Sequence, residues 1–249
     1  MNALRLTLLY VLSLLSGSAT AAYVSSGKEP IYLGAQACGK CHDGPQMGHQ
    51  FSKWRLTAHA KAYAALSLPA AREITKLSGI TEEPHKAKMC LGCHATASEE
   101  EDWERGEEFH LEDGLQCEAC HGPGSEYATK EIMKNKARAM SNGLRIYTKE
   151  DCLICHRVKG SHDAVLKKKP FNLEQALVTI AHPIPKEKPE VEATPEGPKT
   201  SSAHPFTGVM ACAACHTGPK FNFQFSQWRM SKHARAYAEL ATAKGFEIA

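Results

Sequence analysis

Five Cys-x-x-Cys-His motifs constrain this chain of 249 residues more than any other feature. All ten cysteines belong to these motifs, and a histidine directly follows every pair. The motifs are Cys38, Cys41 and His42; Cys90, Cys93 and His94; Cys117, Cys120 and His121; Cys152, Cys155 and His156; and Cys212, Cys215 and His216. The pattern is that of c-type haem attachment, in which two thiols bond the porphyrin and the histidine binds the iron from the proximal side. Disulfides or zinc ribbons would give no reason for a histidine after each pair. The sequence therefore predicts five covalently attached haem c groups.

Residues 1–22 have the pattern of a secretory signal peptide. Arg5 supplies the positive charge, an apolar run covers 6–15, and Ala19-Thr20-Ala21 is a small-residue cleavage site. A membrane anchor is the rival interpretation, but the run is about half of the roughly 20 residues that a span requires. We expect an exported protein in the periplasm, with the outer cell surface or the medium as alternatives. No later stretch is long and apolar enough to span a membrane.

Composition predicts a mainly α fold. Val, Ile and Phe are sparse, and the hydrophobic fraction of 43% includes the ten cysteines and the apolar N-terminus. We expect short helices and loops wrapped around closely packed covalent haems, with little or no sheet, because the porphyrins must supply much of the apolar interior. A formal net charge of +3 is too small to suggest nucleic-acid binding.

Similar sequences near the two ends of the mature chain form an internal repeat. Residues 211–240 align with residues 37–66 without a gap, and both contain Phe-Ser-x-Trp-Arg followed by His-Ala-x-Ala-Tyr-Ala-x-Leu. The segments 51–66 and 225–240 are rich in Ala, Leu, Lys and Arg and lack Gly and Pro, so each is expected to be a helix.

Charged, proline-rich sequence in 183–203 has no apolar periodicity and is typical of a linker. The chain is therefore divided into the signal peptide, a tetrahaem module in 23–182, the linker, and a monohaem C-terminal segment in 204–249 that repeats 37–66.

The tetrahaem module resembles the tetrahaem cytochromes c of ammonia-oxidising bacteria that accept electrons from hydroxylamine oxidoreductase. The similarity includes Trp54 before the run Thr57-Ala58-His59-Ala60-Lys61-Ala62, and Gly122-Pro123-Gly124 after the third motif. It continues through the fourth motif to the segment 171–182. The resemblance implies a mostly helical protein with closely stacked haem pairs and with redox proteins as partners.

The resemblance also implies distal ligands. His59 would bind the haem of the His121 motif, and His182 would complete the haem of the His156 motif. Met133 falls close to the place where the family has the distal histidine of its first haem, which makes it the candidate for the His42 haem. The family's second haem lacks a distal protein ligand, so the His94 haem could be open, although His85 or His110 could close it.

The fifth motif departs from the family. If His59 serves a haem other than that of its own motif, its repeat equivalent His233 should do so too. The chain could be a fragment of a longer one, His233 could bind a haem in another subunit, or it could fold back. His204 is a weaker candidate for the distal ligand of the His216 haem. His49 and His162 stay unassigned.

These patterns favour an electron-transfer cytochrome, since iron closed by two axial ligands exchanges electrons and does little else. The first alternative is a haem enzyme that acts on a small nitrogen compound at an open iron, for which no catalytic residue is assigned. The second is a subunit of an extracellular cytochrome filament, a homo-oligomer joined through His233.

Overall fold

The computed structural model describes residues 29–186 and 206–248. The signal peptide in 1–22, most of the linker in 183–203, and His204 lie outside the described residues. The described residues include both repeats, all five motifs and the remaining candidate ligands.

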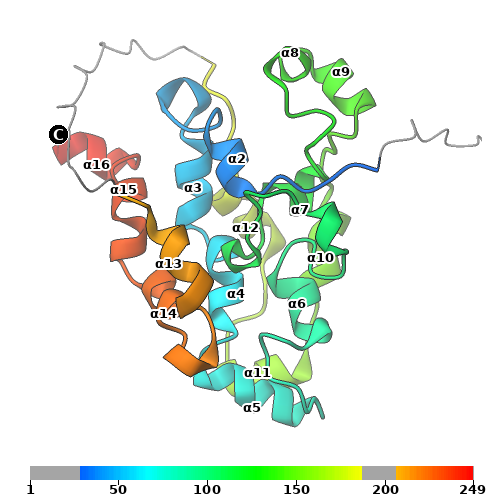
Figure 1. Ribbon diagram of the computed structural model, residues 1–249, viewed down its shortest axis with the longest axis vertical. Coiled ribbons are helices and arrows are strands. Elements are labelled where there is room, and N and C mark those ends of the chain that lie inside the picture. The colour runs from blue at the N-terminus through cyan, green and yellow to red at the C-terminus, as the bar shows by residue number, and fades with distance from the viewer. Residues whose placement is uncertain (1–28, 187–205, 249) are drawn as a thin grey trace, which may run out of the picture.

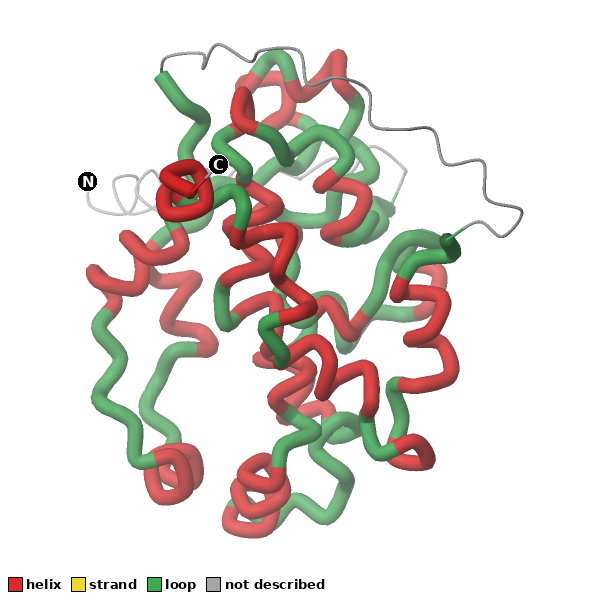
Figure 2. Tube along the Cα trace, turned by 90° about the vertical axis from the view of Figure 1, so that its left-hand side faces the viewer, coloured by secondary structure: helices red, strands yellow, loops and turns green. Residues whose placement is uncertain are grey.

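The described chain is mainly α-helical, as the sequence predicts, and its helices are short pieces joined by loops (Figures 1 and 2). The tetrahaem module contains α2 (Ala35–Gly39), α3 (Gln50–Leu56), α4 (Ala62–Ala65), α5 (Pro69–Leu77), α6 (Lys88–His94), α7 (Cys117–His121), α8 (Lys130–Met133), α9 (Lys136–Ser141), α10 (Lys149–Cys155), α11 (Gly160–Leu166) and α12 (Leu173–Ile180). The C-terminal segment contains α13 (Val209–His216), α14 (Gln224–Met230), α15 (Ala236–Glu239) and α16 (Ala243–Ile248). Between these ranges lie the 3-10 turns η2 (Pro45–Met47), η3 (His59–Lys61), η4 (Asp102–Glu104), η5 (Leu111–Asp113), η6 (Pro219–Phe221) and η7 (His233–Arg235). Within the described residues, the only β pairing is an isolated bridge between Tyr32 and Arg105.

The repeated segments are not the single helices that their composition predicts. In the first repeat, α3 ends at Leu56, the next residue Thr57 is extended with a ψ of 165°, and the chain resumes as η3 and α4. The Thr57 hydroxyl donates a hydrogen bond to the Trp54 carbonyl at 2.7 Å. At Ser231 the second repeat has the same extended backbone, with a ψ of 163°, although the Ser231 hydroxyl has no hydrogen-bond partner. The expectation of one helix was wrong in both repeats; in the first, the Thr57 hydroxyl bonds to nearby backbone and competes with helix continuation.

Side chains alone form a thin core. Most of the buried apolar positions in the described chain are alanines, and one small cluster of larger residues packs Leu66 against Leu91 and Ala95. The largest fully buried side chains are polar ones, namely Glu118, Asp113, Ser52 and Ser226. This interior agrees with a fold in which haem supplies much of the apolar volume.

The C-terminal segment packs against the first repeat. Helix α14 contacts α4 and α15 contacts α3, so α13–α16 lie along one side of α3 and α4 (Figure 1). Arg229 of α14 forms a buried ion pair with Asp113 at 2.7 Å and donates to the Ala60 carbonyl at 2.7 Å. Arg55 of α3 donates in turn to the Ala234 carbonyl. The two repeats therefore share an interface rather than standing apart.

Candidate haem sites

Each attachment motif lies on a short helix or at its end. The motif of His42 begins on α2, and the others lie on α6, α7, α10 and α13 or directly after them. None of the ten cysteines forms a disulfide. One helical turn brings residues three and four apart to the same face, so each pair of thiols and the following imidazole can meet one porphyrin. Among the described residues, no three His, Cys, Asp or Glu side chains gather closely enough to hold a bare metal ion.

Hydrogen bonds orient four of the five proximal imidazoles. The Nδ1 atom lies 2.8 Å from the Ala62 carbonyl in His94 and 3.1 Å from the Arg145 carbonyl in His121. In His42 and His216, Nδ1 lies 2.7 Å and 2.5 Å from the side-chain oxygens of Gln50 and Gln224. Each of these oxygens can only accept, so Nδ1 carries the proton and Nε2 is left free to bind iron.

Gln50 and Gln224 are functional residues that the sequence analysis missed. They occupy equivalent positions in the two repeats, eight residues after the motif histidine. Gln50 also donates from Nε2 to the His182 carbonyl at 2.9 Å, so it links a proximal histidine to a distal candidate. The preserved glutamine within the repeat was the signal that could have found them.

Burial keeps several of the imidazoles neutral. Desolvation is the largest cause that lowers the pKa of His59, His94, His121 and His156. Nearby imidazole charge lowers the pKa further at His59, through His156, and at His121, through His182. A neutral imidazole is the form that binds iron.

Two histidine pairs have the spacing of axial ligands. The ring centres of His59 and His156 are 5.9 Å apart, and those of His121 and His182 are 6.3 Å apart. Metal–imidazole bonds of about 2 Å place the ring centres of two axial histidines roughly 6 Å apart. The residues present therefore fit two irons, each held between a proximal and a distal histidine.

The family resemblance implies other partners, namely His59 for the haem of the His121 motif and His182 for that of the His156 motif, and these ligand roles stay predictions. In the structure the His59 ring lies beside that of His156, and the His182 ring lies beside that of His121. The reason lies in the chain after the fourth motif, where Phe171 stacks on His156 at 4.1 Å. Helix α12 then carries the chain onward by about 12 Å, at 1.5 Å per residue, before His182 is reached. His182 is thereby held near Gln50 and the third motif.

Interactions between thiols indicate which of the first four motifs are neighbours. The Cys38 and Cys117 thiols interact where α2 packs on α7, which lowers the pKa of Cys38 and raises that of Cys117. Burial and then the Cys93 thiol raise the pKa of Cys155 to about 11. Burial and then the charge of Cys152 raise the pKa of Cys120. Neighbouring motifs thus follow the order first, third, fourth and second.

Glu118, inside the third motif, anchors the segment before the first motif. Its side chain is fully buried and accepts hydrogen bonds from the backbone N–H groups of Leu33, Gly34 and Gly124 at 2.7–2.8 Å. Burial raises its pKa, and the three backbone bonds oppose that shift. Gly34 has a φ of 91°, and a Cβ there would lie 2.7 Å from the Glu108 carbonyl oxygen, so the approach requires glycine. This carboxylate holds the first and third motifs together.

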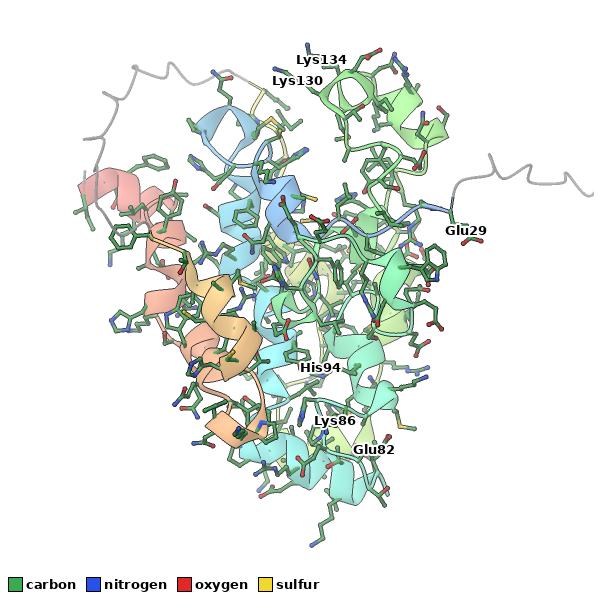
Figure 3. The ribbon with its side chains drawn as sticks, in the orientation of Figure 1. Glu29, Glu82, Lys86, His94, Lys130 and Lys134 are labelled. Atoms are coloured by element: carbon green, nitrogen blue, oxygen red, sulfur yellow. The ribbon has the colours of Figure 1, made fainter. Side chains whose placement is uncertain are left out.

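The other candidates have different surroundings. Met133 is half-buried at the end of α8, which packs on α9, and Figure 3 shows Lys130 and Lys134 of the same segment at the upper edge of the molecule. His233 is exposed. The His85 ring packs edge-on against Phe223 at 5.0 Å. His110 precedes η5. The ligand roles expected for these residues stay predictions.

A family model described as cytochrome c554 and c-prime matches residues 37–122 and 211–249, together about half of the chain. The chain belongs to this family. Cytochrome c-554 of Nitrosomonas europaea is 25% identical over 139 residues, which cover 50% of this chain and 57% of that protein. The match thus spans little more than half the length of the curated relative. No solved structure matches the chain significantly.

Membership of the cytochrome c554 and c-prime family implies covalently bound c-type haem. The match to 211–249 agrees with the internal repeat, since the model covers the fifth motif as well as the first three. In the described ranges, no helix is both long and apolar enough to cross a bilayer.

Proposed function

We propose that this protein is an exported carrier of single electrons that holds five haem c groups. The observation that carries the proposal is the pair of histidine couples, His59 with His156 and His121 with His182, at the spacing of two axial ligands. A c-type haem supplies one-electron exchange at its iron. Two strong axial ligands leave no position for a substrate, so these two sites favour a carrier over an enzyme.

The spatial order of the motifs supports a path through the module. The Cys38 thiol interacts with that of Cys117, and the Cys155 thiol interacts with that of Cys93. Cys120 and Cys152 interact through their charges. We infer that electrons pass between the first and second motifs by way of the third and fourth, because each motif in this order adjoins the next.

Two of the five motifs are exposed enough to meet partners. Cys41 of the first motif and both Cys212 and Cys215 of the fifth motif are exposed. An exposed attachment helix would bring a haem edge to the surface, where a redox protein can exchange electrons with it. The first and fifth motifs are therefore the proposed contact points for donor and acceptor.

The test is to count haems and to classify their iron in the fully loaded protein. The pyridine haemochrome assay should give five haems per chain, and electron paramagnetic resonance of the oxidised protein should show low-spin signals from the His121 and His156 sites. A redox titration should resolve a spread of potentials, since neighbouring charges interact. A count of four or fewer would contradict the five-haem proposal, and high-spin iron at both paired sites would contradict the carrier.

A second proposal, that the protein assembles through His233, is favoured by the exposure of this residue. In the first repeat the equivalent His59 faces a haem-binding histidine, whereas His233 is exposed beside Tyr237 and Leu240, which are also exposed. The proposal is that His233 binds a haem iron in a neighbouring subunit. The mass in solution should then exceed that of a monomer and should fall for His233→Ala; a monomeric wild type would overturn it.

A further inference from the structure

His162 has a buried ring nitrogen that nothing in the structure satisfies. Its Nδ1 atom is fully enclosed and has no hydrogen-bond partner. A buried polar atom without a partner costs free energy, so its persistence calls for a ligand or another compensating contact. None of the roles derived above uses His162.

Helix α11 places this imidazole beside the second motif. Lys159, directly before α11, has its Nζ 3.3 Å from the Cys93 sulfur. His162 follows three residues later, in the first turn of α11. The Ser161 hydroxyl is 2.9 Å from that of Ser78, and α11 packs along α5. Figure 1 shows α11 beside α5 and below α6, the helix that carries His94.

Charge interactions support the same placement. The charge of Lys159 lowers the pKa of both His94 and His162, after desolvation as the larger cause at each. The charge of His94 also lowers the pKa of His162. His94 and His162 are therefore near enough to interact electrostatically, and the contact of His94 Nδ1 with the Ala62 carbonyl leaves its Nε2 free to bind iron.

We propose that His162 is the distal ligand of the haem attached at Cys90 and Cys93, opposite His94. The proposal rests on haem being bound there and deepens the carrier function. It also departs from the open second haem that the family resemblance implies, because a second imidazole closes the iron to small nitrogen compounds. The Lys159 amine is the nearest competitor for the same position.

The alternatives from the sequence are less well placed. His85 packs its ring on Phe223, and the charges that act on it come from Glu83, Lys86 and Arg72, not from His94. His110 lies on the segment between the second and third motifs, where its carbonyl accepts from Gln116 at 2.9 Å. His85→Ala is a matched control, since it removes a half-buried imidazole whose Nδ1 is also unpartnered.

The experiment compares the wild type, His162→Ala and His85→Ala as fully loaded holoproteins. Electron paramagnetic resonance of the oxidised proteins and titration of the reduced proteins with carbon monoxide count the open irons. His162→Ala should gain one high-spin haem and bind one more equivalent of carbon monoxide than the wild type. Added imidazole should restore the low-spin signal, and His85→Ala should match the wild type.

A second substitution keeps the test valid if His162→Ala folds poorly. His162→Met retains an axial ligand, so the iron should stay low-spin while one haem potential rises. An unchanged count of open irons in His162→Ala would overturn the proposal, as would an iron that opens in Lys159→Met but not in His162→Ala.

Haem counting on the same samples separates the two proposals. A missing haem at another motif contradicts the five-haem count and leaves the His162 comparison readable. A missing haem at Cys90 and Cys93 overturns both.

Discussion

The two repeats show how much of a haem site is local. In both, a 3-10 turn after the motif leads to two consecutive left-handed residues, Gly48 and His49 in one and Asn222 and Phe223 in the other. In both, a glutamine orients the motif histidine. The phenylalanine and tryptophan of each repeat pack at 5.5 Å and 5.7 Å between ring centres. The same residues therefore build the same local site at opposite ends of the chain.

The repeats differ in what covers them. Tyr63 and Leu66 pack into the cluster with Leu91 and Ala95, and Leu66 is 5% exposed. Their equivalents Tyr237 and Leu240 are 68% and 65% exposed. The Trp54 indole donates to the Leu115 carbonyl at 2.7 Å, a contact supplied by the module. The same tyrosine and leucine of the repeat thus lie on an interior face in one setting and on the surface in the other.

The two repeats make reciprocal contacts with each other, but only one of the two arginines involved also forms a buried ion pair. Arg55 donates to the Ala234 carbonyl, and its equivalent Arg229 donates to the Ala60 carbonyl, which is the equivalent of Ala234. Only Arg229 also meets a buried carboxylate, Asp113. The interface therefore has approximate two-fold symmetry in its backbone contacts and none in its ion pair.

The largest expected contrast separates His59 from His233. His59→Ala removes the imidazole that faces His156, so one haem should become high-spin and its potential should shift strongly, since axial ligands set haem potentials over about 0.8 V. His233→Ala should leave the spectrum of the monomer unchanged. Electron paramagnetic resonance and a redox titration of both variants check this. Equal spectra for the two variants would contradict the His59–His156 pair.

Removing the ion pair should break the interface between the repeats. Arg229→Ala leaves the Asp113 carboxylate buried without its counter-charge, which should lower the free energy of unfolding by about 3–5 kcal/mol. Arg55→Ala is the matched control and should lower it by less, about 1.5–3 kcal/mol, since one hydrogen bond from a charged group is lost. Guanidinium unfolding of the holoproteins, followed by circular dichroism, measures both. Equal losses would mean that Asp113 finds another partner.

The difference in burial predicts a difference in packing energy. Leu66→Ala should lower the free energy of unfolding by about 2–5 kcal/mol, because it leaves a cavity in the apolar cluster. Leu240→Ala should change it by less than about 0.5 kcal/mol, as for an exposed residue. The measurement should be made at two protein concentrations. A large, concentration-dependent loss for Leu240→Ala would show that a second molecule covers this face.

The smallest effect should come from the two glutamines. Gln50→Leu and Gln224→Leu each remove the acceptor of an Nδ1–H bond, which makes the ligating imidazole less basic and raises the potential of its haem. Gln50→Leu should act more strongly, since Gln50 also holds the His182 carbonyl. Redox titration with spectra at each potential tests the direction. A lowered potential in either variant would show that the glutamine does not set the imidazole tautomer.

The sequence by itself determined the attachment chemistry, the repeat and the helical class. These depend on residues within one or two helical turns, where spacing fixes geometry: Cys38, Cys41 and His42 must lie on one face of a turn whatever the rest of the chain does. The single helix expected for 51–66 is interrupted by an equally local effect, the hydrogen bond of the Thr57 hydroxyl to nearby backbone. Composition alone does not predict this interruption.

Only the tertiary structure decided which histidines face one another and which face of a repeat is buried. His59 is far from His156 in sequence, as His121 is from His182. The residues around each histidine do not indicate which other histidine lies near it. Each pair of rings lies close together because of the path that the chain takes through Phe171 and α12. Leu66 is buried because Leu91 of α6 packs against it. Long-range contacts decide which histidines lie together, because the two axial ligands of one haem come from segments whose local sequence patterns are unrelated.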